Sequence, residues 1–247
     1  MANVGSKGIL EHCDNPSSTI VSATEGSTVT WAVSSDTSDT AIVRAVAAGK
    51  GLHYAGATYA TDDNMLEFCS NNLNFAGQEG HCEAEVLLQL DSVSNVAFNF
   101  GFNDDVLDAS NSLPAELATA TWTTNAATFV GLVFDTDATN DELHAMWVDD
   151  DTDAVTPLAD LRFKGIAPTA GKWFYMKVEL DDLGSGKGLR ATFLAVDHNG
   201  KSVEKAFNTT VDRDCPLCFY LGVENRSASV HNVYIRKPNW KQTIPDM

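Results

Sequence analysis

Apolar and polar residues alternate with a period of two along much of the chain, and this alternation predicts β-strands with one buried face. In segment 83–90, EAEVLLQL, it would place Ala84, Val86, Leu88 and Leu90 together on the buried face. Strands with one solvent-exposed face are typical of antiparallel sheets. The same pattern recurs in segments 96–102, 173–180, 218–225 and 230–237.

Other segments predict hairpins. Residues 189–196 and 201–207 both have strand character, and the DHNG between them contains an Asn199-Gly200 pair, which favours a tight turn. TFVGLVF, residues 128–134, is apolar on both faces, so we expect a central strand that is covered on both sides. ELHAMWV, residues 142–148, follows closely enough to pair with it.

Two segments depart from the strand pattern. LPAELATAT, residues 113–121, has the composition of a helix, with Pro114 in its first turn. Residues 1–40 are rich in Ser, Thr and Asp and include one predicted strand, STVTWAV, at 27–33. We therefore expect an N-terminal arm with one strand over 1–40. Residues 41–247 would form a mainly β, antiparallel sandwich with one short helix.

The composition fits a single β domain and limits its partners. The chain has 247 residues, of which 44% are apolar, so it can bury a substantial core. Its 34 acidic residues against 16 basic ones give a net charge of −18. Such a surface repels nucleic acid and anionic lipid, so we expect neither as a partner.

The first residues, MANVGSKGILEHC, lack a basic segment followed by an apolar run, so we expect no signal peptide. No window approaches the ~18 consecutive apolar residues of a membrane-spanning helix. We therefore expect synthesis and folding in the cytoplasm, in agreement with the odd number of cysteines.

Two clusters of aspartates flank the predicted strand 142–148. Asp135, Asp137 and Asp141 would lie in the turn that precedes it, where Asp side chains readily accept hydrogen bonds from local backbone. These three residues are also candidate calcium ligands. DTDATND lacks the glycine of an EF-hand loop, and the acids have no fixed separation across a cleft, so solvated turns are the leading interpretation.

Cys215 and Cys218 have the CxxC spacing of one half of a zinc site. The second half would have to come from His12-Cys13 or His81-Cys82, because the chain has no second CxxC. Buried free thiols are the preferred interpretation. The sequence also contains neither a Gly-x-Ser-x-Gly motif nor a phosphate-binding glycine loop, so we expect no enzyme.

Four aromatic residues are candidates for an interface: Trp31, Trp173, Tyr175 and Trp240. Trp173 and Tyr175 would face outward if the neighbouring Phe174 and Met176 face the core. Large aromatic side chains are enriched in interfaces between proteins, and an exposed strip of them can also stack against sugars. Both roles remain open on this evidence.

The order of certain segments resembles that of concanavalin A-like and laminin-G-like jelly rolls. The resemblance covers about residues 60–240 and depends on the strand that follows Trp173, the turn at Asn199-Gly200, Leu221-Gly222, and the closing strand Val233 to Ile235. It implies a two-sheet sandwich. That fold serves lectins, lyases, adhesion modules and virion parts alike, so it does not decide function.

An acidic, all-β chain without a leader also resembles, more narrowly, the decoration (cement) proteins of tailed phages. This resemblance implies a non-enzymatic virion protein on the outer capsid surface. Its partners would be the major capsid protein and further copies of itself, as a homotrimer. The alternative is a lectin-like, carbohydrate-binding module of a tail fibre or cell surface, with a glycan as partner. Neither role requires a cofactor.

Overall fold

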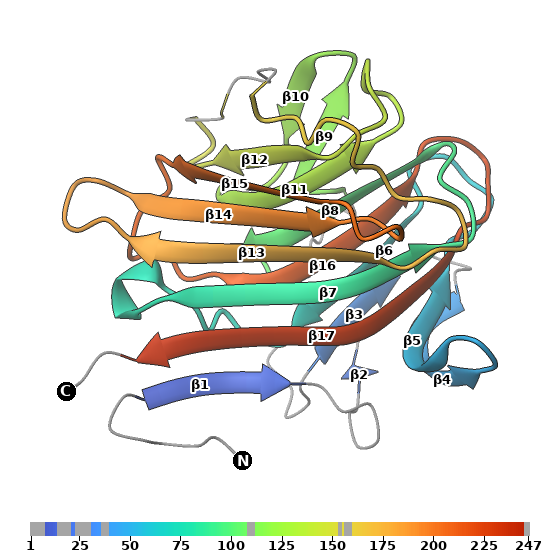
Figure 1. Ribbon diagram of the computed structural model, residues 1–247, viewed down its shortest axis with the longest axis horizontal. Coiled ribbons are helices and arrows are strands. Elements are labelled where there is room, and N and C mark those ends of the chain that lie inside the picture. The colour runs from blue at the N-terminus through green and yellow to red at the C-terminus, as the bar shows by residue number, and fades with distance from the viewer. Residues whose placement is uncertain are drawn as a thin grey trace.

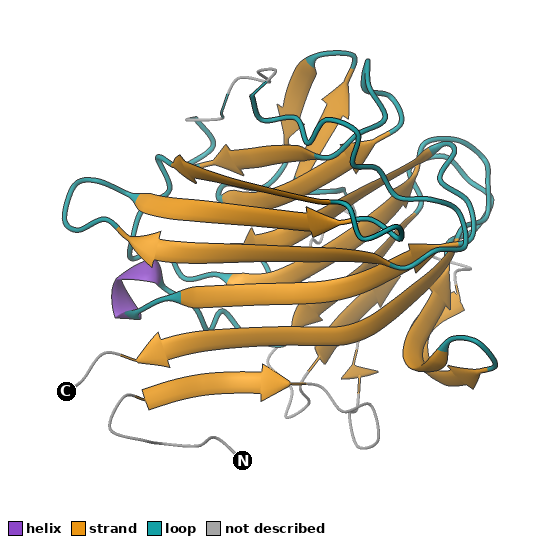
Figure 2. Ribbon diagram, in the orientation of Figure 1, coloured by secondary structure: helices purple, strands orange, loops and turns teal. Residues whose placement is uncertain are grey.

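The computed structural model describes residues 8–13, 21–22, 31–35, 40–107, 112–152, 155 and 160–244. In these residues two sheets pack face to face (Figure 1), and nearly all regular structure is β (Figure 2). Gly77–Glu79 (η1), a single 3-10 turn, is the one helical element within this described part. None of its helices is long and apolar enough to cross a membrane.

The sheet that we call the large sheet contains eight strands in the described residues. Their spatial order is β15 (Ser202–Asn208), β14 (Leu189–Val196), β13 (Phe174–Asp182), β7 (Cys82–Leu90), β17 (Asn232–Ile244), β5 (Gly51–Ala57) and β4 (Thr40–Ala47). β1 (Gly8–Cys13) also pairs with β17. It does so along the C-terminal half of β17, while β5 pairs with the first four residues of that strand.

The other sheet, which we call the second sheet, has seven strands over the same described ranges. Their order is β12 (His144–Val148), β11 (Phe129–Asp135), β8 (Val96–Asn103), β16 (Cys218–Asn225), β6 (Met65–Ser70), β3 (Trp31–Ser35) and β2 (Val21–Ser22). A separate hairpin consists of β9 (Ala115–Ala118) and β10 (Thr121–Thr124).

The core lies between the two sheets. Alternate residues of β7 and β13 are buried there, as the alternation predicts, and Trp31 stacks on Phe68 with ring centroids 4.6 Å apart. The predicted hairpins are also confirmed, because β14 pairs with β15 and β11 pairs with β12. Burying these apolar faces is the main favourable contribution to folding.

The prediction of one solvent-exposed face is wrong for the second sheet. Every residue of β8, β11 and β16 is buried, including the outward-facing Ala97, Asn99 and Gly101. The additional cover includes residues from the segment Leu113–Asn125, whose backbone bonds to the outer face of these strands. The strand 128–134 was expected to be covered on both sides, and β11 confirms this.

The predicted helix over residues 113–121 is wrong, because this segment forms the hairpin β9–β10. The N–H groups of Leu113, Ala115 and Leu117 donate to side chains of the second sheet instead of to carbonyls within a helix. These tertiary acceptors outweigh a helix propensity that is worth only tenths of a kcal/mol per residue, about 0–0.7 kcal/mol.

The segment 1–40, in which one strand was expected, contributes β1 to the large sheet and β2 and β3 to the second sheet. Trp31 of β3 lies in the main core and is 0% exposed. The strands of this segment are therefore integral parts of both sheets. The start of the predicted strand, residues 27–30, lies outside the described residues.

Candidate functional site

Polar side chains line the outer face of the second sheet beneath the β9–β10 hairpin. The Leu113 N–H donates to Glu224 Oε2 at 3.2 Å, and the Ala115 N–H donates to Asn99 Oδ1 at 2.8 Å. The Leu117 N–H donates to Asp135 Oδ2 at 3.0 Å. Because β16, β8 and β11 are neighbours, this extended segment crosses three strands and meets one acceptor on each.

Arg226 neutralises much of the acidic charge at one end of this face. Its Nη2 lies 2.7 Å from Asp135 Oδ2 and its Nε lies 3.1 Å from Asp135 Oδ1, so the pair is bidentate. Its Nη1 pairs with Glu224 and lies 3.7 Å from Glu116 Oε2. Three carboxylates therefore share one guanidinium, and burial raises the pKa of Glu224 to about 7.

The three calcium candidates do not share one environment. Asp135 is 1% exposed and paired with Arg226, whereas Asp137 and Asp141 are exposed. The interpretation as a solvated turn is therefore wrong for Asp135, because this residue is buried and ion-paired. The local sequence could not show this, since Arg226 lies 91 residues away. Among the described residues, the groups whose potential ligand atoms lie within 4.8 Å of one another do not include these three. Calcium binding at this turn stays a prediction.

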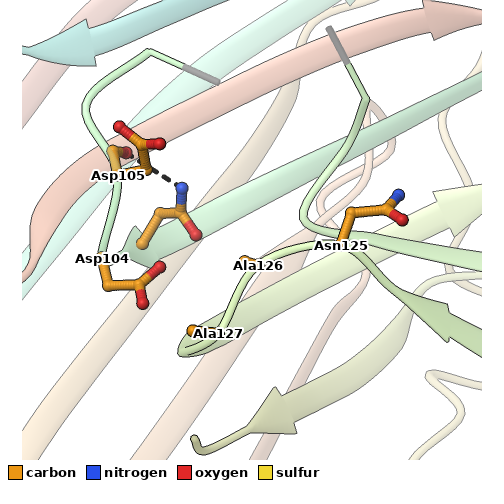
Figure 3. Close-up of a pocket in the computed structure, with 6 residues that line it drawn as sticks. Asp104, Asp105, Asn125, Ala126 and Ala127 are labelled. Atoms are coloured by element: carbon orange, nitrogen blue, oxygen red, sulfur yellow. Dashed lines mark hydrogen bonds between the residues drawn. The ribbon is translucent and has the colours of Figure 1, made fainter. Parts of the chain in front are cut away.

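A pocket opens where β8 ends and the loop after β10 begins (Figure 3). Its volume is about 200 Å³, and its lining consists of Asn103, Asp104, Asp105, Asn125, Ala126 and Ala127. Asp104 and Asp105 lie on one side of it, while Asn125, Ala126 and Ala127 lie on the other. Carboxylate and amide groups thus face two small apolar residues.

Asn103 is a buried residue of the lining of this pocket. Its side chain is 1% exposed, and Nδ2 donates to the Asp105 carbonyl at 2.9 Å. Oδ1 is buried and accepts no hydrogen bond within the described structure. A buried acceptor without a donor costs about 1–3 kcal/mol.

Acidic groups surround the pocket. Asp104 Oδ2 accepts from the Thr128 N–H at 2.9 Å, and Asp149 Oδ1 accepts from the Asp212 N–H at 3.1 Å. Burial raises the pKa of both Asp104 and Asp149 above the ordinary range. Asp149, Asp150 and Asp212 also bring carboxylate oxygens within 4.8 Å of one another. The site is therefore rich in acceptors and repels anions.

Among the described residues, no cysteine belongs to a group of side chains that could hold a metal ion, as the alternative of a zinc site requires. Cys69, Cys82, Cys215 and Cys218 are free thiols, and of these only Cys215 is not fully buried. Burial raises the pKa of Cys82 to about 12 and that of Cys215 to about 11, so these thiols stay protonated at neutral pH. The side chains of His12 and Cys13 lie outside the described residues.

The four aromatic interface candidates separate into two groups. Trp31 lies in the core, and the buried Trp240 packs against Phe75 with centroids 5.3 Å apart, so an interface role for these two tryptophans is wrong. Trp173 and Tyr175 are half-buried on the outer face of the large sheet, as predicted from the alternation. Tyr175 Oη donates to Glu85 at 2.5 Å, which fixes its orientation.

The sequence reasoning missed the pocket because it treated residues 103–112 as an ordinary loop. A signal was present: Asn103, Asp104 and Asp105 follow directly after an apolar strand, where loop side chains meet at the edge of a sheet. Asn125 could not have been found in this way. Its position depends on the hairpin that was expected to be a helix.

Comparisons with known proteins identify the architecture. No protein-family model matches the chain, and no curated protein matches it. A protein of unknown function from Shewanella oneidensis MR-1 superposes with a TM-score of 0.57 at 9% identity, over 99% of this chain and 90% of its own.

Two similar structures are sugar-recognition proteins by name. The Emp47p carbohydrate recognition domain gives a TM-score of 0.53 at 9% identity, over 94% of this chain and 96% of its own. Peanut lectin, solved with a nine-residue peptide, gives 0.54 at 12% identity, over 96% of this chain and 98% of its own. Identities this low support a shared fold alone, and the chain therefore has the concanavalin A-like jelly-roll fold that the segment order indicates.

Proposed function

We propose that this chain is a non-enzymatic, carbohydrate-binding module and that the pocket at Asn103 holds the sugar. The observation that carries the proposal is a pocket at the end of β8 that is lined by carboxylate and amide groups. Two proteins of the same fold, the Emp47p domain and peanut lectin, are named for carbohydrate recognition and as a lectin.

The lining matches the chemistry of a sugar ring. Carboxylates accept hydrogen bonds from hydroxyl groups, and a bond to a charged acceptor contributes about 1.5–3 kcal/mol. Asp104 and Asp105 supply the carboxylates, while the methyl groups of Ala126 and Ala127 offer a small apolar surface for the C–H face of the ring. The volume of about 200 Å³ is below the usual range of about 300–1,000 Å³ for ligand pockets, so we propose that a single ring, and not a longer oligosaccharide, enters it.

The surrounding charge selects the class of sugar. Asp104, Asp105, Asp149 and Asp150 place negative charge close to the pocket. Sialylated or uronic acid glycans would be repelled, whereas neutral sugars would not be and protonated amino sugars would be attracted. We therefore propose that neutral or amino sugars are the ligands.

The test is a glycan array that contains neutral, amino and acidic glycans, followed by titration of each positive glycan. We expect D105A and N125A, which change exposed residues of the lining, to weaken binding by about tenfold or more, which corresponds to one lost hydrogen bond of about 1.4 kcal/mol. E204Q is the matched control, because Glu204 is exposed on β15 of the other sheet. The proposal is contradicted if the wild-type chain binds no glycan, or if D105A and N125A bind as tightly as the wild-type chain.

The similar structures do not support a role on a capsid, and two of them are carbohydrate-recognition proteins by name. The major capsid protein, a homotrimer and the outer capsid surface therefore stay predictions. Calcium is a further element of the proposal only at Asp137 and Asp141, which are exposed. Thermal unfolding with calcium and with a chelator tests it, and equal melting temperatures would remove it.

A further inference from the structure

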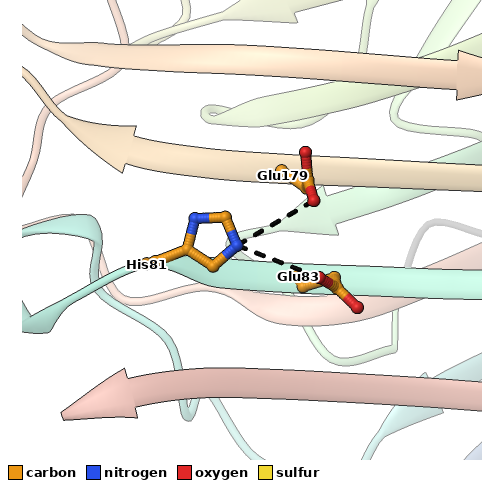
Figure 4. Close-up of side chains that lie close together, drawn as sticks. All are labelled: His81, Glu83 and Glu179. Atoms are coloured by element: carbon orange, nitrogen blue, oxygen red, sulfur yellow. Dashed lines mark ion pairs between the residues drawn. The ribbon is translucent and has the colours of Figure 1, made fainter.

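A second cluster of chemically active side chains lies on the outer face of the large sheet, away from the pocket. His81 directly precedes β7, Glu83 lies on β7, and Glu179 lies on the adjacent strand β13 (Figure 4). Glu83 and Glu179 are paired directly across the two strands. His81 and Glu83 are two residues apart, so all three side chains leave the same face.

The potential ligand atoms converge. His81 Nε2 lies 3.9 Å from Glu83 Oε2 and 4.0 Å from Glu179 Oε1, and all three atoms lie within 4.8 Å of one another. In a tetrahedral zinc site with bonds of about 2.0–2.2 Å, ligand atoms are roughly 3.4 Å apart. A shift of the two glutamate carboxylates by about half an ångström towards His81 Nε2 would reach that spacing.

Asp181 fixes the orientation of the imidazole. His81 Nδ1 lies 2.8 Å from Asp181 Oδ1, two residues beyond Glu179 on β13. Without a metal, the carboxylates of Glu83 and Asp181 raise the pKa of His81 to about 9, so the ring is protonated at neutral pH. A metal would displace the Nε2 proton, while the Nδ1–H would still donate to Asp181. Metal-binding histidines in proteins are oriented by the same carboxylate contact.

Lys177 and the protonated His81 supply the positive charge in the absence of a metal. Its Nζ lies 2.6 Å from Glu179 Oε1 and 3.9 Å from Glu83 Oε2. Two glutamates directly opposite each other repel, so this place requires a cation. With Lys177 and the protonated His81, the set of Glu83, Glu179 and Asp181 still carries one excess negative charge.

We propose that His81, Glu83 and Glu179 bind a divalent transition metal, with zinc as the preferred ion and Asp181 as the positioning residue. Imidazole with carboxylate favours zinc or a similar ion, whereas calcium is bound by oxygen ligands alone. Three protein ligands leave a fourth position for water or for a group on a partner. The site is independent of the proposed sugar pocket, since it lies on the other sheet.

The test uses the full chain after treatment with a chelator and removal of the chelator. Zinc is titrated by calorimetry at pH 7.5, and cobalt is added in a parallel experiment to record its visible absorption. We expect one zinc ion per chain and the strong absorption of tetrahedral cobalt. H81A should abolish both signals, while H198A, which removes an exposed histidine from the β14–β15 turn, should retain them.

Two further variants separate a metal site from a simple ion-pair network. D181N should weaken zinc binding about 10–100-fold, the usual effect of removing a group that orients a ligand. K177M should strengthen zinc binding, because the competing cation is gone. E179Q serves as a second ligand variant in case H81A does not fold, and it should weaken binding at least tenfold.

The proposal is overturned if the wild-type chain binds zinc no better than H81A and E179Q. It is also overturned if K177M lowers stability without strengthening zinc binding, since Lys177 would then be the intended partner of the two glutamates. These results do not depend on whether the chain binds sugars.

Discussion

At the scale of single residues, the arrangement around Arg226 explains why an aspartate can be buried on the outer face of a sheet. Asp135 is 1% exposed, and its two oxygens accept from Arg226, from the Leu117 N–H and from the Asp137 N–H. The bidentate pair with Arg226 and the two hydrogen bonds from backbone N–H groups together offset the cost of removing the Asp135 carboxylate from water.

Replacement of Arg226 by methionine should strongly destabilise the chain. The change leaves Asp135 and Glu224 buried without their cation, and breaking a buried ion pair from one side costs about 3–5 kcal/mol. Chemical denaturation measures the free energy of unfolding. The double variant D135N/R226M should recover part of that loss, and a double variant as unstable as R226M alone would contradict this account.

Glu224 should make stability depend on pH. Burial raises its pKa to about 7 from an ordinary value of 4.5, so the folded state binds the proton more tightly than the unfolded chain. This stabilising contribution is complete below about pH 4.5 and is lost as pH rises through about 7. Asp104 and Asp149, whose pKa values are also raised, act in the same direction at lower pH.

The variant E224Q isolates this effect, because glutamine keeps an acceptor for the Leu113 N–H but does not titrate. Between pH 5 and 7, the free energy of unfolding should fall less steeply with pH for E224Q than for the wild-type chain. Parallel curves for the two proteins would show that Glu224 does not carry the dependence.

At the scale of elements, the β9–β10 hairpin is held by the sheet beneath it. Three side chains of β16, β8 and β11 accept from alternate backbone N–H groups of the segment that leads into and forms β9. Alternate N–H groups of an extended segment point to the same side, which a helix cannot reproduce. The acceptors therefore select an extended conformation for a segment whose composition favours a helix.

Replacement of Asn99 by alanine removes one of these acceptors. The buried Ala115 N–H would lose its partner, so we expect a loss of about 1–3 kcal/mol in the free energy of unfolding. Hydrogen exchange should show faster exchange at Ala115 while the amides of β13 remain protected. E204A, a change at an exposed position, is the control. Uniform loss of protection would mean that the hairpin and the sandwich unfold together.

At the scale of the whole molecule, the net charge of −18 opposes the compact state through self-repulsion. Basic groups of the described residues pair with acids at several places, among them Arg226 with Asp135, Lys177 with Glu179, and Arg213 with Asp182. The repulsion between exposed acids is left to the solvent and its ions.

Salt should therefore stabilise the chain. Raising the NaCl concentration from 10 to 150 mM shortens the screening length from about 30 Å to about 8 Å, so repulsion between exposed acids weakens. We expect the melting temperature to rise by a few degrees, since about 1 kcal/mol corresponds to roughly 2–4 °C for a domain of this size. Choline chloride at equal ionic strength should give the same rise, and an effect of NaCl alone would indicate a specific sodium site instead.

The sequence alone determined several of the strands and, in the large sheet, their buried faces. Alternation fixes which side of β7 or β13 is apolar, and the Asn199-Gly200 turn fixes a hairpin, because both are local properties of the chain. The segment order was sufficient to indicate a concanavalin A-like sandwich. The outward direction of Trp173 and Tyr175 followed from the same alternation.

The tertiary structure alone decided which polar residues meet. Asp135 pairs with Arg226, which lies 91 residues away, and His81 pairs with Asp181, which lies 100 residues away. Asn103 and Asn125 line the same pocket only because residues 115–124 form a hairpin. Local pattern cannot encode such meetings, since the energy of a buried polar group depends on partners that the fold brings from elsewhere in the chain.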